Sequence, residues 1–136
     1  TLFEKTYVDI KNRHYQTKHY QLSDINGTQI IELDIEIEGE IQRLRGEGNG
    51  PISAMLNALQ LPIDVVNYEE RSISSGANAK ALALIELQVK GTGKSAFGAG
   101  VHDNIVTSSI DAIIACTNRL IEQGVLTTDQ VVAAAV

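Results

Sequence analysis

Hydrophobic and polar residues alternate strictly from residue 31 to residue 38. Branched aliphatic residues occupy one set of positions and carboxylates the other, namely Ile31, Leu33, Ile35 and Ile37 against Glu32, Asp34, Glu36 and Glu38. Successive side chains of a strand point to opposite faces, so this pattern predicts a strand over residues 28–37 with one buried face and one face in water.

Turn sequences bound this strand and place another strand on each side of it. Asn26-Gly27 tolerates the positive φ of a tight hairpin, so residues 15–22 are predicted to form the preceding strand. Glu38-Gly39 forms the next turn, and residues 41–45 then return beside the acidic strand. Glu–Arg pairs across these strands would each contribute about 0.2 to 1 kcal/mol.

Glycine and proline then end the strand pattern and open a helix. Pro51 suits a first helical turn, where its missing N–H is no loss, and the helix is predicted over residues 52–59. After Pro62 the same order returns, with strands predicted around residues 63–73, at 81–89 and at 96–97. A long amphipathic helix follows from Asp103 or Asn104 to Gln123, with Gly124 as its C-cap.

This order predicts an internal duplication. Each half has three strands and a helix, and a Gly-x-Gly precedes each helix, at residues 46–48 and 98–100, an offset of 52 residues. We therefore expect one α+β domain over residues 1–136, built from two βββα repeats at about 14–60 and 62–124. The helices would cover one face of the sheets or lie between them, and the tail, 125–136, could add one or two helical turns.

Composition narrows the possible partners. The net charge is -6 and no basic stripe is present, so nucleic acid and anionic membranes are poor partners. No apolar run reaches the roughly 18 to 20 residues of a membrane span, and we expect a soluble, cytoplasmic protein. With two Phe and no Trp, the core must be mainly aliphatic. The single cysteine, Cys116, falls in an apolar helical pattern and is interpreted as a buried structural thiol.

Two features could bind a small ligand. The glycine-rich junctions, with Gly48, Gly50 and Gly100, could expose the N–H groups of a helix start to a carboxylate, or they could simply allow tight turns. The polar run at residues 67–71 and the bend at 74–79 could form a rim for a ligand or an exposed strand edge. No metal cluster, nucleophile with a base, or phosphate-binding loop emerges: Gly93-Lys94-Ser95 lacks the required glycine five positions earlier.

Taken in order, several short segments carry a family likeness: 48–54 (GNGPISA), 67–70 (NYEE), 76–79 (GANA), 98–100 (GAG), 104–109 (NIVTSS) and 118–119 (NR). The chain resembles the C-terminal regulatory domain of 2-isopropylmalate synthase, long form, from about Leu2 to Gly124. Asn67 and Asn78 stand where this family often has Asp, which leaves the choice of effector open.

The resemblance implies a homodimeric domain that binds L-leucine as a feedback inhibitor of leucine biosynthesis. It implies a leucine pocket formed by Ile52, Ser53, Val65, Tyr68, Ser72, Ala79, Val101 and Asp103. The parent enzyme would condense acetyl-CoA with 2-oxoisovalerate in an upstream TIM barrel that holds a divalent metal, whereas this domain would be non-catalytic and need no cofactor. A bulky residue at Gly100 or Ser72 should then abolish leucine binding and spare the fold.

Other interpretations remain open. The same domain in citramalate synthase would bind isoleucine, and a structural dimerisation module would bind no ligand at all. An independent small enzyme is disfavoured because the sequence offers no catalytic constellation.

Overall fold

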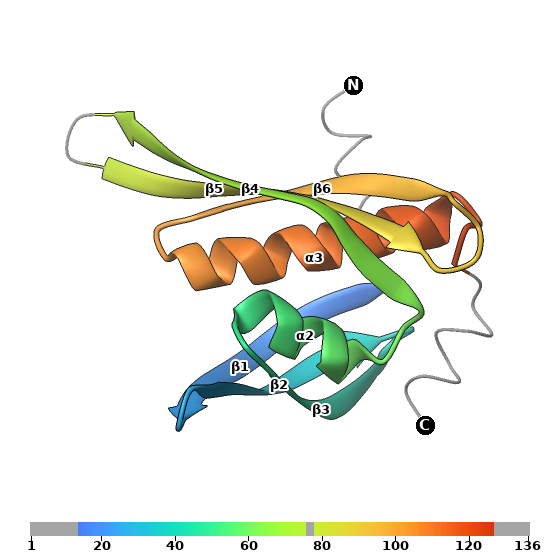
Figure 1. Ribbon diagram of the computed structural model, residues 1–136, viewed down its shortest axis with the longest axis horizontal. Coiled ribbons are helices and arrows are strands. Elements are labelled where there is room, and N and C mark those ends of the chain that lie inside the picture. The colour runs from blue at the N-terminus through green and yellow to red at the C-terminus, as the bar shows by residue number, and fades with distance from the viewer. Residues whose placement is uncertain (1–13, 76–77, 127–136) are drawn as a thin grey trace.

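The computed structural model describes residues 14–75 and 78–126. The first unit contains β1 (Tyr15–Ile25), β2 (Thr28–Ile37), β3 (Glu40–Gly48) and α2 (Pro51–Leu59), and the second contains β4 (Ile63–Ser75), β5 (Asn78–Val89), β6 (Ser95–His102) and α3 (Ile105–Glu122). Each set of three strands forms its own antiparallel sheet, in the order β1-β2-β3 and β4-β5-β6. The predicted α+β class and the βββα repeat are confirmed (Figure 1). The helical turns predicted in the tail fall on residues 127–136, outside the described residues.

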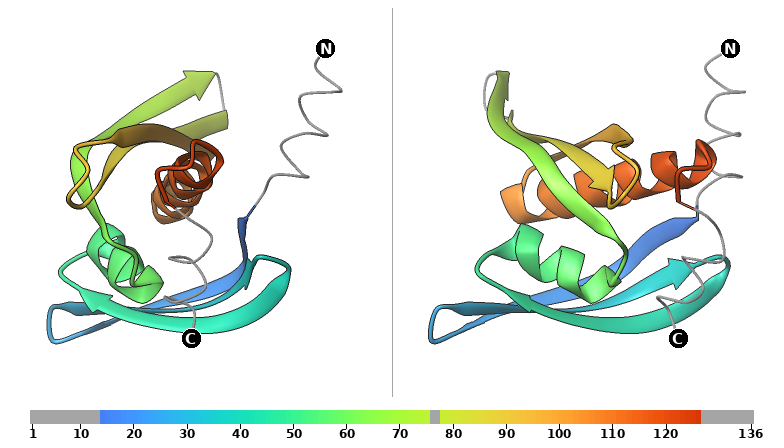
Figure 2. Two further views of the ribbon diagram at one scale, coloured as in Figure 1. Left: turned by 90° about the vertical axis from the view of Figure 1, so that its right-hand side faces the viewer. Right: turned by 45° about the vertical axis from the view of Figure 1, so that its right-hand side comes forward.

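Each unit is a two-layer arrangement of one sheet and one helix, and the units stack so that both helices lie between the sheets (Figures 1 and 2). α2 packs on β3 and β2, whereas α3 packs on β6 and β5 and also reaches β1 of the other unit. Because α3 contacts both units, it joins the two sheets into one core.

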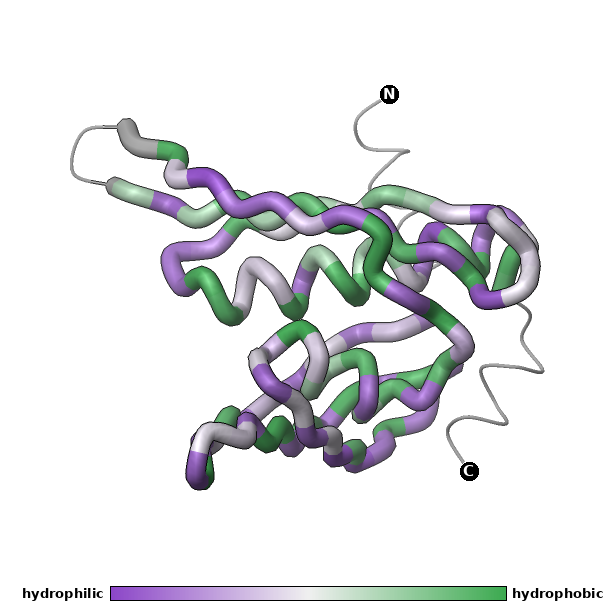
Figure 3. Tube along the Cα trace, viewed as in Figure 1, coloured by the Kyte–Doolittle hydropathy of each residue, from purple (hydrophilic) through white to green (hydrophobic). Residues whose placement is uncertain are grey.

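The core is aliphatic and follows the predicted alternation. Ile31, Leu33, Ile35 and Ile37 of β2 are all buried, as are Ala83, Ile85, Leu87 and Val89 of β5. Figure 3 shows the matching alternation of hydrophobic and hydrophilic residues along the first sheet. Cys116 is fully buried in α3 and its Sγ donates to the carbonyl of Ala96 at 3.0 Å. Burial raises the pKa of this thiol to about 11, consistent with a structural role.

Both hairpin turns of the first sheet use positive φ angles, as their sequences predict. Asn26 and Gly27 have φ of 54° and 84°, and Glu38 and Gly39 have φ of 51° and 88°. Cross-strand ion pairs on this sheet join Arg43 to Asp34, with Nε and Oδ1 3.1 Å apart, and Lys18 to Glu36, with Nζ and Oε1 3.6 Å apart. Arg45 pairs instead with Glu47 of its own strand.

Several predicted strand ends are wrong: β1 runs on to Ile25 instead of ending at residue 22, and β5 begins at Asn78 instead of residue 81. The ends of the two third strands are wrong as well, and glycine packing explains both. The sequence ends the third strand of each unit before the Gly-x-Gly, yet β3 continues to Gly48 and β6 to His102. A Cβ on Gly46 would lie 2.1 Å from the carbonyl oxygen of Ala54, and one on Gly100 would lie 2.1 Å from that of Ser108. These glycines therefore let each helix lie directly against a strand, and they do not form turns.

The same contacts revise the offset between the repeats. Gly46 faces the residues eight and twelve positions later, Ala54 and Ala58, and Gly100 likewise faces Ser108 and Ala112. The junctions therefore correspond at an offset of 54 residues, not the 52 inferred from the Gly-x-Gly motifs. The N-caps of the two helices, Gly50 and Asn104, have this same separation.

Candidate functional site

A groove lies where the starts of α2 and α3 meet β4. It has a volume of about 520 Å³, and we call it the interhelical groove; its lining comprises Asn49, Gly50, Pro51, Ile52, Ser53, Leu56, Val65, Tyr68, Glu70, Ile105, Val106 and Ser109. Residues from both repeats form its walls, so it exists only once the two units have stacked.

Five of the twelve lining residues are aliphatic, namely Ile52, Leu56, Val65, Ile105 and Val106. Leu56 and Val106 pack against the buried core, while Val65 and Ile105 remain 37% and 38% exposed at the opening. Partly exposed aliphatic side chains around a concave surface favour a ligand with a small branched apolar group.

The start of α2 supplies hydrogen-bond donors to the groove. Its N-cap is Gly50, which has no side chain to cap the helix, and Pro51 follows without an N–H. The N–H groups of Ile52 and Ser53 consequently lack partners within the helix, and the positive end of the helix dipole adds to their attraction for an anion.

The start of α3 differs because it is already capped. Asn104 Oδ1 accepts from the backbone N–H of Val106 at 2.8 Å and of Thr107 at 3.2 Å. The two helix starts, which the sequence suggested as a matched pair of anion sites, are therefore unequal. A carboxylate in the groove would find free donors at α2.

Tyr68 and Glu70 supply the polar side chains of the β4 wall. The Tyr68 hydroxyl donates to Glu70 Oε1 at 2.5 Å and lies 2.7 Å from Ser109 Oγ on α3. Burial, followed by the hydrogen bond to Glu70, raises the pKa of Tyr68 to about 12. The phenol thus stays protonated at neutral pH, and Glu70 offers negative charge to a cationic group on a ligand.

Comparison with known proteins places this arrangement in a family. Residues 1–121 match the family model described as the LeuA allosteric (dimerisation) domain. The chain belongs to this family. It is 39% identical over 118 residues to a 2-isopropylmalate synthase of Paraburkholderia phytofirmans, 41% identical over 121 residues to one of Azoarcus sp. and 40% identical over 108 residues to one of Agrobacterium fabrum.

These matches cover most of this chain but little of each relative. They include 87%, 89% and 76% of the chain, against 20%, 21% and 19% of the relatives' length. The chain thus spans about a fifth of the curated relatives that it matches. The resemblance drawn from the short sequence segments is confirmed at the level of the family.

Part of the pocket that the resemblance implies comes together in the interhelical groove. Ile52, Ser53, Val65 and Tyr68 line it, and Gly50 lies at its α2 end. Ser72 lies beyond Glu70 on β4, on the same face as Tyr68 by strand alternation, and it is exposed.

The other implied residues lie elsewhere in this chain. Ala79 pairs with Ser74 toward the far end of the β4–β5 hairpin. Val101 pairs with Leu82, whereas Tyr68 pairs with Ile85, three positions further along β5. Because side chains alternate along a strand, Val101 and Tyr68 lie on opposite faces of the sheet. Asp103 forms an ion pair with Lys80 at 2.8 Å, and this hydrogen bond lowers its pKa.

Two of the glycines assigned to helix starts pack beneath helices instead. A Cβ on Gly48 would lie 2.6 Å from the backbone nitrogen of Ala54, and the Gly100 position is closed in the same way by Ser108. A bulky residue at Gly100 would therefore disturb the strand–helix contact, so the expectation that it would spare the fold is wrong.

The groove also contains residues that the sequence did not single out as a site, namely Leu56, Ile105, Val106 and Ser109. Glu70 was expected only as part of a possible ligand rim at residues 67–71. No signal in the sequence could join them, because their proximity depends on how the repeats stack.

Among residues 14–75 and 78–126, no group of three His, Cys, Asp or Glu side chains is placed to hold a metal ion. Neither α2 nor α3 has the length and apolar character needed to cross a membrane.

Proposed function

We propose that the chain is the regulatory domain of a 2-isopropylmalate synthase and that it binds L-leucine in the interhelical groove. The observation that carries the proposal is the uncapped start of α2 facing an aliphatic groove whose β4 wall bears Glu70. The free N–H groups of Ile52 and Ser53 would hold the carboxylate, Glu70 the ammonium group, and the aliphatic lining the isobutyl group.

The family name and the names of the relatives support this proposal. A domain of this family is described as allosteric, and the matched relatives are 2-isopropylmalate synthases. The condensation of acetyl-CoA with 2-oxoisovalerate would belong to the remainder of such an enzyme. Leucine would inhibit it only by favouring one of two states of the whole protein, and couplings of this kind are about 1 to 3 kcal/mol.

The proposal is tested by isothermal titration of the chain with L-leucine, L-isoleucine and L-valine. Saturable binding that prefers leucine would support the leucine sensor. A preference for isoleucine would favour a regulatory domain of the citramalate synthase type, and no binding by the folded chain would favour a structural dimerisation module.

A matched pair of variants locates the ligand. Glu70→Gln removes the charge proposed to hold the ammonium group and should weaken leucine binding at least about tenfold, the equivalent of about 1.4 kcal/mol. Glu69→Gln is the control, because Glu69 neighbours Glu70 but points to the other face of the strand and pairs with Arg71 at 2.8 Å. Equal effects of the two variants, or none from Glu70→Gln, would contradict this placement.

A further inference from the structure

The outer faces of the two sheets, which point away from the helices, differ sharply in chemistry. On the central strand of the first sheet, β2, the outer face carries Glu32, Asp34 and Glu36, whereas on the central strand of the second, β5, it carries Leu82, Leu84 and Glu86. The internal duplication makes this a direct comparison, because the two strands have the same place in their units.

The third strands show the same contrast. The outer residues of β3 that pair with Glu36, Asp34 and Glu32 are Ile41, Arg43 and Arg45, and those of β6 that pair with Glu86, Leu84 and Leu82 are Phe97, Ala99 and Val101. Five of these six outer residues are charged in the first sheet, against one of six in the second. Phe97 and Val101 are 59% and 51% exposed, and with Ala99, Leu84 and Leu82 they form one contiguous apolar patch across β6 and β5. Contiguous exposed apolar patches mark interaction sites more often than isolated apolar residues do.

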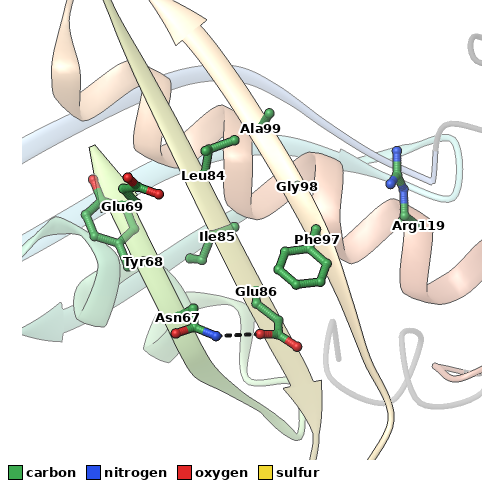
Figure 4. A pocket seen from close by; sticks show the side chains of 10 residues that line it. All are labelled: Asn67, Tyr68, Glu69, Leu84, Ile85, Glu86, Phe97, Gly98, Ala99 and Arg119. Carbon is green, nitrogen blue, oxygen red and sulfur yellow. Dashed lines mark hydrogen bonds between the residues drawn. The ribbon is translucent and has the colours of Figure 1, made fainter. Parts of the chain in front are cut away.

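Polar groups border this apolar surface along β4. Asn67 pairs in register with Glu86, Glu69 with Leu84, and Arg71 with Leu82. Glu86, the one carboxylate on the central strand here, is satisfied within the chain: Asn67 Nδ2 donates to it at 2.6 Å (Figure 4). Ser95 Oγ also donates to it, at 2.6 Å. An apolar centre with a polar border and internally bonded charges is typical of a protein–protein interface.

We infer that the outer face of the β4–β6 sheet, centred on Phe97, Ala99 and Leu84, is the surface through which two copies of this chain pair. The family is described as a dimerisation domain, but that description does not say which surface pairs. A second copy fits this face because the face carries both a projecting ring and a hollow.

Phe97 is the projecting ring, and beside it lies a hollow of about 530 Å³ whose lining includes Leu84, Phe97 and the small Ala99 (Figure 4). An interface between identical copies must be self-complementary, so that a projection on one copy meets a hollow on the other. The outer face of the first sheet, with Arg43 and Asp34 joined in an ion pair, offers no comparable apolar surface. The inference rests on dimerisation alone and does not depend on a ligand in the interhelical groove.

The duplication supplies matched variants for the test. Phe97→Glu places a charge at the centre of the outer face, and Ala99→Arg fills the hollow with the residue that the first sheet has at the equivalent position, Arg45. Ile41→Glu is the control, because Ile41 is a large apolar residue, 66% exposed, on the outer face of the third strand of the first sheet. All three residues are exposed, so the variants should fold, which far-ultraviolet circular dichroism checks.

Sedimentation velocity over a wide range of concentrations measures the pairing. We expect the unaltered chain and Ile41→Glu to dimerise alike, and the dissociation constants of Phe97→Glu and Ala99→Arg to rise at least tenfold. The inference is overturned if either variant of the outer face dimerises as tightly as the unaltered chain, or if Ile41→Glu weakens pairing equally. It is also overturned if the unaltered chain stays monomeric, since the face must then be covered by another segment or protein. Titration with leucine tests the groove separately in every variant.

Discussion

The Tyr68 hydroxyl lies 2.7 Å from Ser109 Oγ and thereby ties an edge strand of the second sheet to α3. The same hydroxyl donates to Glu70, and Ser109 Oγ donates to the carbonyl of Ile105 at 2.9 Å. Tyr68 and Ser109 have one hydroxyl proton each, so these three contacts share two protons and the hydrogen bonds at this point are interdependent. A ligand group that binds Glu70 would therefore also affect the contact between β4 and α3.

Tyr68→Phe removes the hydroxyl and should lower the free energy of unfolding by about 1 kcal/mol, the usual net value of a hydrogen bond. It should also weaken leucine binding, because Glu70 loses the partner that positions it. Urea denaturation and calorimetric titration measure the two effects. Tyr20→Phe is the control, since Tyr20 contacts Thr107 of the same helix at 2.6 Å but does not line the groove. A loss of affinity in both variants would mean that general loosening of α3, and not the position of Glu70, sets the affinity.

Gly100→Ala should destabilise the domain by at least about 2 kcal/mol, because its Cβ would overlap the backbone of Ser108 and a helix cannot move aside cheaply. Gly50→Ala is the comparison, because a Cβ there meets nothing within 4 Å and its φ is -160°. Thermal and urea denaturation of both variants provide the measurement. Similar stabilities would show that the close strand–helix contact is not what requires glycine at this position.

Asn104→Ala should lower the free energy of unfolding by about 1 kcal/mol, because the N–H groups of Val106 and Thr107 lose their acceptor. Asn104→Ser keeps an oxygen in reach and should retain most of the stability. Urea denaturation followed by circular dichroism compares the two. A serine variant as unstable as the alanine variant would indicate that Asn104 acts through something other than helix capping.

Acidic pH should lower the free energy of unfolding of the domain, partly because Glu86 becomes protonated. Hydrogen bonds from Ser95 and then from Asn67 hold the pKa of this carboxyl below its ordinary value of 4.5 in the folded chain. A lowered pKa contributes stability that is present above about pH 4.5 and is lost as the pH falls through the folded-state value. Ser95→Ala should bring the pKa closer to 4.5 and reduce the slope of stability against pH in that acidic range. Equal slopes in denaturation series at stepped pH would refute this role.

Local sequence accounts for much of the fold. The alternation from Ile31 to Glu38 sets the buried face of β2, and Asn26-Gly27 sets a hairpin turn, because strand period and positive φ are properties of neighbouring residues. The repeated order of elements gives the two βββα units for the same reason. The ends of β3 and β6 were not predicted. The glycines there are required by the helix that packs against each strand, and not by the residues adjacent in sequence.

The candidate site, like the fold, was predictable from the sequence only in part. The sequence by itself determined the family, the elements and the residues at the start of α2, since these depend on the order of residues along the chain. Only the tertiary structure brought Glu70 and Ile105 to α2, separated Val101 from Tyr68, and left Phe97 exposed on an uncovered sheet face. Stacking of the two repeats and side-chain direction across each sheet decide these relationships, and both depend on contacts between residues far apart in the chain.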